Sequence, residues 1–255
     1  MDIITRNFFH ILQQGAFHEK NQTEPMSPFK WKRLIQMAQD QGVTAYFTHV
    51  TGNNHQQPDD DEATDEQLTD VTNLSNRYLN HQLIKILETE KNDEDAQPET
   101  QQLLAIIIYN VKKMLNSKLS LKGIIELGKF LRTKGHKVDF VKIEKWLNKL
   151  HLKRIAQLQG SILITDFNFQ EEEIPFVEKI EKDAHKLLLK TIAHTQNDAA
   201  EEWHFRQREN GFVRNNSRLM RRNIRRNARY LKYAAIESTS TFVANFLKSL
   251  SEIEE

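Results

Sequence analysis

The chain has too few glycines and prolines to form the many tight turns of a β-rich fold. Eight glycines and five prolines are spread over 255 residues, less than half the roughly 12% of an average chain. Between them, apolar residues recur every three or four positions, which is the period of an amphipathic helix. We therefore predict an all-α fold, a multi-helix, bundle-like domain with at most one or two short strands, near Tyr46 and Leu163.

Local signals mark where several of these helices begin and end. Ser27 before Pro28 places a capping residue ahead of proline at the first helical position, and Gly42 supplies the matching stop. Asp139 is the expected cap of a later helix. Pro175 is expected to begin another, because the three glutamates before it suit the positive end of a helix dipole.

Two acidic stretches interrupt the helical pattern. Residues 51–64 contain almost nothing apolar and are expected to form a disordered acidic loop. Residues 88–101 form a second acidic break that contains Pro98. We predict an N-terminal region, residues 1–100, of helices with acidic loops, which packs on or hangs from a helical body, residues 101–255.

The sequence excludes several classes of site and compartment signal. It contains no cysteine, which excludes disulfides, zinc–thiolate and iron–sulfur sites and thiol nucleophiles. The N-terminus lacks the charged segment and apolar core of a secretory signal. The longest compact apolar run, Leu103 to Tyr109, has seven residues, far fewer than the ~18 that cross a bilayer. We expect a cytoplasmic protein without a transmembrane segment.

The most unusual stretch is the basic segment, residues 206–232. It holds ten arginine and lysine residues and one acid, so its net charge is +9 and that of the remaining chain is −8. Five of the cations step by four and three positions, which places them on one face of a helix. The predicted polyanion-binding residues are Arg218, Arg221, Arg222, Arg225, Arg226, Arg229 and Lys232. A separate apolar face is expected from Met220, Ile224, Ala228, Leu231 and Ala235.

Several partners suit such a basic face. Nucleic-acid phosphates would pair with guanidinium groups, which bind them in a bidentate manner. An anionic membrane surface would suit an amphipathic basic helix, although the apolar face is thin and contains alanine. The protein's own acidic stretches, residues 59–66 and 88–99, are a third partner. A solvated helix face that packs on its other side needs no partner.

The sequence carries no recognisable catalytic or metal-binding motif. Glycine-rich phosphate loops, the nucleophile elbow and the His-Glu-x-x-His zinc motif are all missing. His185 and His194 are nine residues apart and would face different directions on a helix. We therefore predict no catalytic residue, no metal and no cofactor, and favour a binding protein over an enzyme.

Residues 119–164 carry a recurring helical pattern that is known from another group of proteins. Its matching positions are Glu126-Leu127, Phe130-Leu131, His136, Val138-Asp139-Phe140 and Trp146-Leu147. The pattern resembles the helical C-terminal part of a family of uncharacterised bacterial nucleotidyltransferases. Leu34, Ala38, Gly42 and Val43 resemble that family's opening helices, so the resemblance spans roughly half the chain.

The residues that such a transferase needs for catalysis are not found. Its activity requires a Gly-Ser turn for phosphates and an Asp-x-Asp pair for Mg²⁺, whose hard charge demands carboxylate oxygens. Gly160-Ser161 is the only Gly-Ser dipeptide, and Asp166 has no second acid two residues later. The resemblance therefore implies a helical relative that binds or scaffolds.

Three hypotheses of function follow from the sequence. The first is a non-enzymatic binding or accessory protein that contacts a polyanion, such as nucleic acid, through its arginine-rich helix. The second is an accessory or degenerate relative of a nucleotidyltransferase. The third is a structural protein that forms homo-oligomers through apolar helix faces.

Overall fold

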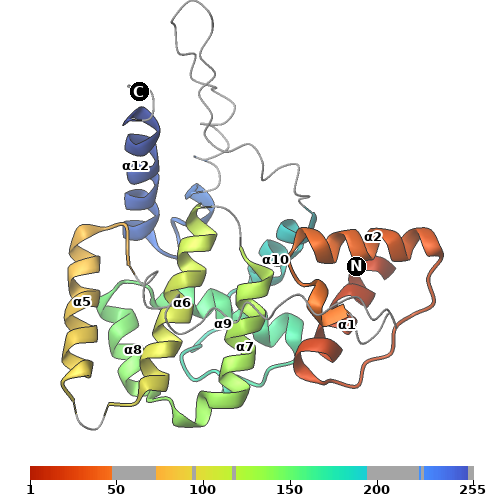
Figure 1. The fold of residues 1–255 in the computed structure, drawn as a ribbon, viewed down its shortest axis with the longest axis horizontal. Coiled ribbons are helices and arrows are strands. Elements are labelled where there is room, and N and C mark those ends of the chain that lie inside the picture. Colours follow the sequence, from red (N-terminus) through yellow and green to blue (C-terminus); the bar gives the residue numbers. More distant parts are fainter. Residues whose placement is uncertain (48–72, 94–95, 117–118, 194–223, 225–226, 252–255) are drawn as a thin grey trace, which may run out of the picture.

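The described part of the chain is built of helices. The computed structural model describes residues 1–47, 73–93, 96–116, 119–193, 224 and 227–251 (Figure 1). Over these ranges there is no strand, so the all-α prediction is confirmed. Tyr46 lies in the 3-10 helix η1 (Thr44–Phe47), and Leu163 lies inside helix α9 (Lys153–Phe167). None of the described helices is long and apolar enough to cross a membrane.

The helices follow one another in the order shown by the colours of Figure 1. Before α9 come α1 (Ile3–Phe17), α2 (Pro28–Asp40), α5 (Arg77–Lys91), α6 (Pro98–Asn116), α7 (Leu121–Lys134) and α8 (Phe140–Lys149), and after it come α10 (Ala184–Ala193) and α12 (Ala235–Ser251). Two further 3-10 turns are η2 (Gly135–Lys137) and η3 (Glu171–Glu173).

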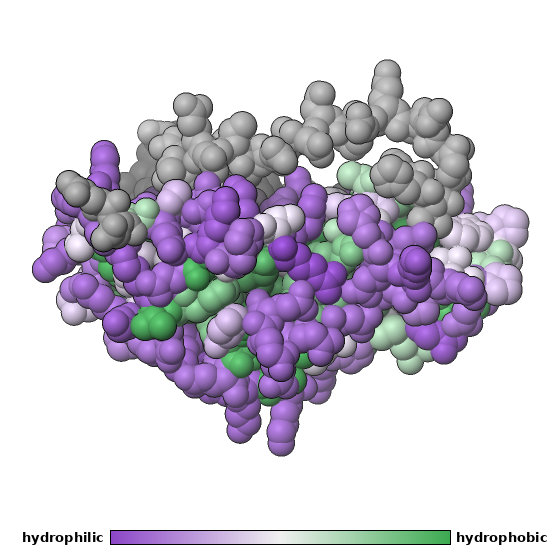
Figure 2. All heavy atoms as spheres, turned by 90° about the horizontal axis from the view of Figure 1, so that it is seen from below, coloured by the Kyte–Doolittle hydropathy of each residue, from purple (hydrophilic) through white to green (hydrophobic). Residues whose placement is uncertain are grey.

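Helices α6, α7 and α9 form the centre of the fold. They pack against one another, α8 packs on α6 and α9, and α10 lies along α9. Helix α1 packs on α7 and α9, and α2 packs on α1. The buried apolar side chains form one cluster that extends from Ile4 to Ala234. The face seen from below is mostly hydrophilic, with apolar residues visible only between polar ones (Figure 2).

The core continues across the boundary predicted between residues 100 and 101. That boundary falls in the first turn of α6, where the buried Thr100 hydroxyl accepts a hydrogen bond from the Asp139 backbone N–H at 2.9 Å. Since α1 also packs on α7 and α9, the N-terminal region packs on the helical body rather than hanging from it.

A polar junction joins the three central helices inside the core. The Asn110 amide on α6 donates to the Gly123 carbonyl on α7 at 3.0 Å and to the Gln159 side chain on α9 at 3.1 Å. Gln159 donates in turn to the Ile107 carbonyl at 3.2 Å. A Cβ at Gly123 would clash with the Asn110 side-chain oxygen. The missing side chain at Gly123 therefore makes room for this junction.

Helix α12 is held at its start by a buried carboxylate. Glu237, of which 1% is exposed, accepts hydrogen bonds from the backbone N–H groups of Ser75 at 2.5 Å and Asn76 at 3.1 Å. Asn76 itself caps α5, because its side chain accepts from the Leu79 N–H at 3.0 Å. The start of α12 is thereby fixed to the start of α5.

Most capping signals in the sequence are confirmed. Helix α2 begins at Pro28 as predicted, but the Ser27 side chain before it makes no capping hydrogen bond. Gly42 follows the end of α2 with a φ of 65°, a conformation that glycine adopts without strain. The Asp139 side chain accepts from the Lys142 N–H at 3.0 Å at the start of α8. Ser120 caps α7 in the same way through the Gly123 N–H at 3.1 Å.

Two predicted boundaries are wrong. Helix α5 continues to Lys91, and Pro98 is the first residue of α6, a position that tolerates proline because its N–H would be unpaired. Pro175 does not begin a helix, since α10 starts only at Ala184. The segment before α10 is irregular because its residues Ile174 and Val177 are buried against α9, where Gly160 leaves room for them. The acidic loop predicted for residues 51–64 lies outside the described residues.

We expect Gly15→Ala to lower the free energy of unfolding by about 1–3 kcal/mol, because a Cβ there would clash with the Tyr46 carbonyl oxygen in η1. Alanine otherwise stabilises a helix interior relative to glycine. Urea denaturation followed by circular dichroism measures the change.

Gly135→Ala is the matched control for Gly15→Ala. Gly135 has a φ of −57° and nothing lies within 4 Å of an added Cβ, so this change should raise stability by up to about 1 kcal/mol. Equal stabilisation by the two substitutions would contradict the close packing of η1 on α1.

Candidate functional site

The structure describes two of the seven predicted polyanion-binding residues, Arg229 and Lys232. Arg218, Arg221, Arg222, Arg225 and Arg226 lie outside the described residues. Residues 227–230 are helical, but residues 231–233 form a turn, and α12 begins at Ala235. The prediction of one helical face that extends to Lys232 is therefore wrong at its last position. The chain leaves the helix there because Tyr230 and Tyr233 are both buried.

Lys232 already has an anionic partner within the protein. Its ammonium group pairs with the Asp183 carboxylate and lies 4.6 Å from the centre of the Tyr233 ring. The hydrogen bond from Lys232 lowers the pKa of Asp183, and the same bond raises the pKa of Lys232. The Lys232 carbonyl accepts from the Arg154 guanidinium at 3.0 Å. Lys232 thus anchors the end of the basic segment to the body.

The apolar face predicted for this segment is wrong in its described part. Ile224 is 44% exposed and Leu231 39% exposed, and Ala228 and Ala235 are also exposed. The buried residues are instead Asn227, Tyr230, Tyr233 and Ala234. A tyrosine ring offers more apolar area than isoleucine or leucine and can keep its hydroxyl hydrated or bonded, so the two tyrosines determine which side packs.

Arg229 remains half-buried on this short helical turn. No ion pair joins its guanidinium to another residue in the described ranges. Asp183 pairs instead with Lys232, and Glu181 pairs with Arg154 at 2.9 Å. Of the two described cations of the basic segment, Arg229 is thus the one whose charge is still available to a partner.

A carboxylate–histidine pair joins α9 to α10. Only 2% of the Asp166 side chain is exposed, and its Oδ1 lies 2.5 Å from Nδ1 of His185. Its Oδ2 accepts from the Thr165 hydroxyl at 2.7 Å, and its carbonyl accepts from the Gln13 amide at 2.8 Å. Such a carboxylate fixes the orientation of an imidazole. These contacts tie α1, α9 and α10 together.

The dipeptide that could have supplied a phosphate-binding turn lies inside a helix. Gly160 and Ser161 are both buried in α9. The Ser161 hydroxyl accepts a hydrogen bond from the Glu181 backbone N–H at 3.0 Å. Its role in the described structure is to hold the irregular segment before α10.

A second basic surface was not predicted from the sequence. The α2 surface comprises Phe29, Lys30, Trp31, Lys32, Arg33 and Ile35. Phe29 is 76% exposed and Ile35 38% exposed, and the three cations are exposed while Trp31 is half-buried. The sequence places Trp31 and Ile35 on one stripe with Leu34 and Ala38, but only the latter two are fully buried. A run of cations interleaved with aromatic residues was the signal that was overlooked.

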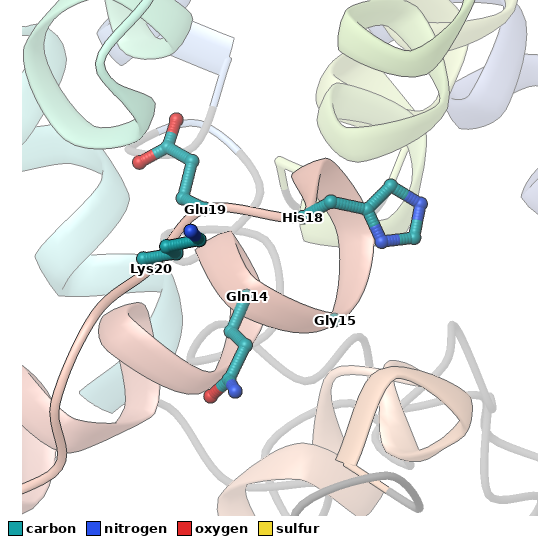
Figure 3. Close-up of a pocket in the computed structure, with 5 residues that line it drawn as sticks. All are labelled: Gln14, Gly15, His18, Glu19 and Lys20. Carbon is teal, nitrogen blue, oxygen red and sulfur yellow. The ribbon is translucent and has the colours of Figure 1, made fainter.

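Two open depressions lie at the N-terminal end of the protein. The first, about 350 Å³, is lined by Gln14, Gly15, His18, Glu19 and Lys20. Their side chains point away from one another (Figure 3), so they do not converge on a ligand. The second, about 590 Å³, runs along α2. Its lining in the described part of the chain is Pro28, Trp31, Lys32, Ile35, Gln36 and Gln39.

Neither metal-binding geometry among the described residues nor similarity to known proteins points to a further site or to a family. Within the described ranges, no three His, Asp or Glu side chains gather closely enough to hold a metal ion. The chain matches no known protein family, no characterised protein and no solved structure in the comparisons made. The relationship to nucleotidyltransferases therefore stays a prediction.

Asp166→Ala should lower the free energy of unfolding by about 1–3 kcal/mol, because it removes the buried acceptor of Thr165 and His185. His185→Ala should lower it by less, since the His185 side chain is 45% exposed. If the pair holds α9 to α10, the double variant should lose less stability than the two single variants added together. The difference in the free energy of unfolding should be at least about 0.5 kcal/mol.

Chemical denaturation of the four proteins in this cycle measures the coupling. His136→Ala, at an exposed histidine in η2, is the control and should change stability by no more than about 0.5 kcal/mol. Strict additivity of the Asp166 and His185 substitutions would show that the contact does not stabilise the fold.

Proposed function

We propose that the protein is a non-enzymatic, cytoplasmic binding or accessory protein that holds a polyanion, foremost a nucleic acid, through its basic segment. The observation that carries the proposal is that several described acids of the body are already paired with lysine or arginine, as Asp183 is with Lys232, Glu181 with Arg154 and Glu90 with Lys142. Without Lys232, the basic segment still has nine arginines and one acid. Such a run of guanidinium groups suits the phosphates of a polyanion.

The acidic stretch at residues 88–99 supports this proposal by its pairing. Glu90 and Asp93 both contact the Lys142 ammonium group, at 2.9 and 3.1 Å, and Glu99 contacts Lys137 at 3.6 Å. The hydrogen bonds that Lys142 donates to Glu90 and Asp93 raise the pKa of Lys142. These three carboxylates are thus engaged with lysines of the body, which weakens the alternative that this stretch neutralises the arginines.

The anchoring of the segment also suits binding. Tyr230 and Tyr233 are buried, the Arg154 guanidinium lies 5.3 Å from the centre of the Tyr233 ring, and the Ser238 hydroxyl donates to the Asn227 carbonyl at 3.1 Å. Arginines attached to a fixed point lose less freedom on contact with phosphates than they would on a free tail. Bidentate guanidinium–phosphate pairs make such contacts stronger than lysine contacts.

Fluorescence anisotropy with labelled DNA and RNA, repeated across salt concentrations, tests the proposal. Replacing Arg221, Arg222, Arg225 and Arg226 by glutamine removes up to four phosphate contacts. On duplex DNA each contact contributes about −0.9 to the slope of log K against log salt. We therefore expect the slope to become less steep by about 3 to 4, with weaker binding at low salt.

The matched control removes four exposed lysines from α5 and α8 instead: Lys85, Lys91, Lys145 and Lys149, each changed to glutamine. Both variants lose the same net charge, so a specific site predicts that only the arginine variant loses affinity. Equal loss in both variants, or no binding by the natural protein at low salt, would refute the proposal.

A second candidate function, self-association, has its own supporting observation. Helix α12 extends beyond the other helices (Figure 1) and leaves Ile236, Val243 and Leu247 exposed by 40%, 52% and 58%. Val243 and Leu247 are four residues apart and therefore lie on one side of the helix. Such a stripe suits the interface of a structural homo-oligomer.

Light scattering should show a concentration-dependent mass if α12 self-associates, and Val243→Glu with Leu247→Glu should reduce it to that of a monomer. Ile84→Glu, at an apolar residue of α5 that is 44% exposed, should leave the mass unchanged. A monomeric natural protein at high concentration would exclude this candidate.

A further inference from the structure

The α2 surface carries cations where they do not help the helix. Lys30, Lys32 and Arg33 lie in the first two turns of α2, which hold no acidic residue in the first turn. The N-terminal end of a helix carries the positive end of its dipole, so Lys30 in the first turn is unfavourable by a few tenths of a kcal/mol, and Lys32 and Arg33 in the second turn gain nothing from the dipole. Their placement is therefore not explained by the stability of α2.

Little within the described protein neutralises these cations. No ion pair joins the three side chains to a residue in the described ranges. The hydrogen bond from the Thr5 backbone N–H is the main cause that lowers the pKa of Asp2, and the Arg33 charge adds to it. Asp40, at the far end of α2, accepts from Gln36 at 3.0 Å. The α2 surface thus keeps a net positive charge.

Aromatic side chains stand among these charges. Phe29 is 76% exposed, so most of its ring faces solvent. Trp31 and Ile35 line the 590 Å³ depression together with Lys32. A flat aromatic ring, an apolar wall and an ammonium group are the chemistry that receives an unstacked base and its phosphate.

We infer that the α2 surface binds the bases of a single-stranded nucleic acid, with Phe29 and Trp31 as stacking platforms and Lys32 and Arg33 on the phosphates. This inference rests on the proposed function and names its ligand class. Duplex bases are stacked on one another and cannot cover these rings, so the duplex gains only the phosphate contacts.

An anionic membrane is a poorer match for the same surface. A helix that lies in a bilayer interface needs one continuous apolar face. Lys32, Arg33 and Gln36 are all exposed and follow Phe29 by three, four and seven residues, so they lie on the same side of α2. An exposed Phe29 ring among these polar neighbours suits stacking on bases better than insertion between lipids.

The test uses three labelled probes of equal length in anisotropy titrations: an oligothymidylate, the same strand with abasic sugars, and a duplex. The abasic strand keeps the phosphates and removes the bases. The natural protein should bind the oligothymidylate most tightly. Phe29→Ala should weaken that complex about five- to a hundredfold, as expected for the loss of one stacked base, and leave the abasic complex unchanged.

Two further variants complete the design. Tyr78→Ala removes an aromatic side chain that is 65% exposed near the start of α5, and it should bind all three probes as the natural protein does. Lys32→Gln with Arg33→Gln should weaken every probe and make the single-strand salt slope less steep by about 0.7 per lost contact. Because Phe29 is largely exposed, its loss should leave the melting temperature unchanged.

The outcomes separate this inference from the proposed function. If the arginine variant loses binding while Phe29→Ala behaves like the natural protein on every probe, the proposed function stands and the α2 inference is overturned. Equal weakening of the oligothymidylate and abasic complexes by Phe29→Ala also overturns it. The inference is also overturned if the protein sediments with phosphatidylserine vesicles in a Phe29-dependent manner and binds no oligonucleotide. Loss of the base preference in Phe29→Ala alone supports it.

Discussion

The fold depends on the amide junction between Asn110, Gln159 and the Gly123 carbonyl. Burying a polar group costs free energy unless it is hydrogen-bonded. The amide N–H groups of Asn110 and Gln159 have acceptors here, whereas the buried Asn110 Oδ1 has no hydrogen-bond partner. Sliding α6, α7 or α9 by one turn would separate these groups and leave several of them buried and unpaired. The apolar residues around the junction could pack in more than one register, whereas the amides allow one. The positions of α1, α8 and α10, which pack on these helices, follow from that choice.

Buried carboxylates extend the same principle to the edges of the structure. Asp166 holds α10 through His185, and Glu237 holds the N-terminus of α5 through two backbone N–H groups. Each carboxylate joins residues that are far apart in the chain or belong to different helices. Because an ionised group is costly to bury without partners, each contact selects one arrangement of its helices. Specificity at the periphery therefore comes from charge, and bulk stability comes from the central apolar cluster.

The sequence predicts local features of this fold well and tertiary ones poorly. Helices and their caps depend on neighbours within four residues, so Asp139 was recognisable as a cap. The irregular segment after Pro175 depends on Gly160, which lies in a different helix and leaves space for Val177. Likewise, Trp31 and Leu34 have the same helical spacing, but only the packing of α2 on α1 decides that Leu34 is the buried one. Of the candidate site, the net charge was predictable, and the pairing of Lys232 with Asp183 was not.

Whether a cation can bind a partner therefore depends on the folded structure, and a count of charges in the sequence does not reveal it. Lys232 belongs to the most basic segment, yet Asp183 takes up its charge. Lys32 and Arg33 belong to an ordinary-looking helix, yet no described carboxylate forms an ion pair with them. Charges that pair internally help to fix the fold, whereas charges left exposed at the positive end of a helix work slightly against it. Lys32 and Arg33 therefore keep their charge toward solvent beside the rings of Phe29 and Trp31, and this combination of charge with flat apolar faces is what the proposed single-strand site uses.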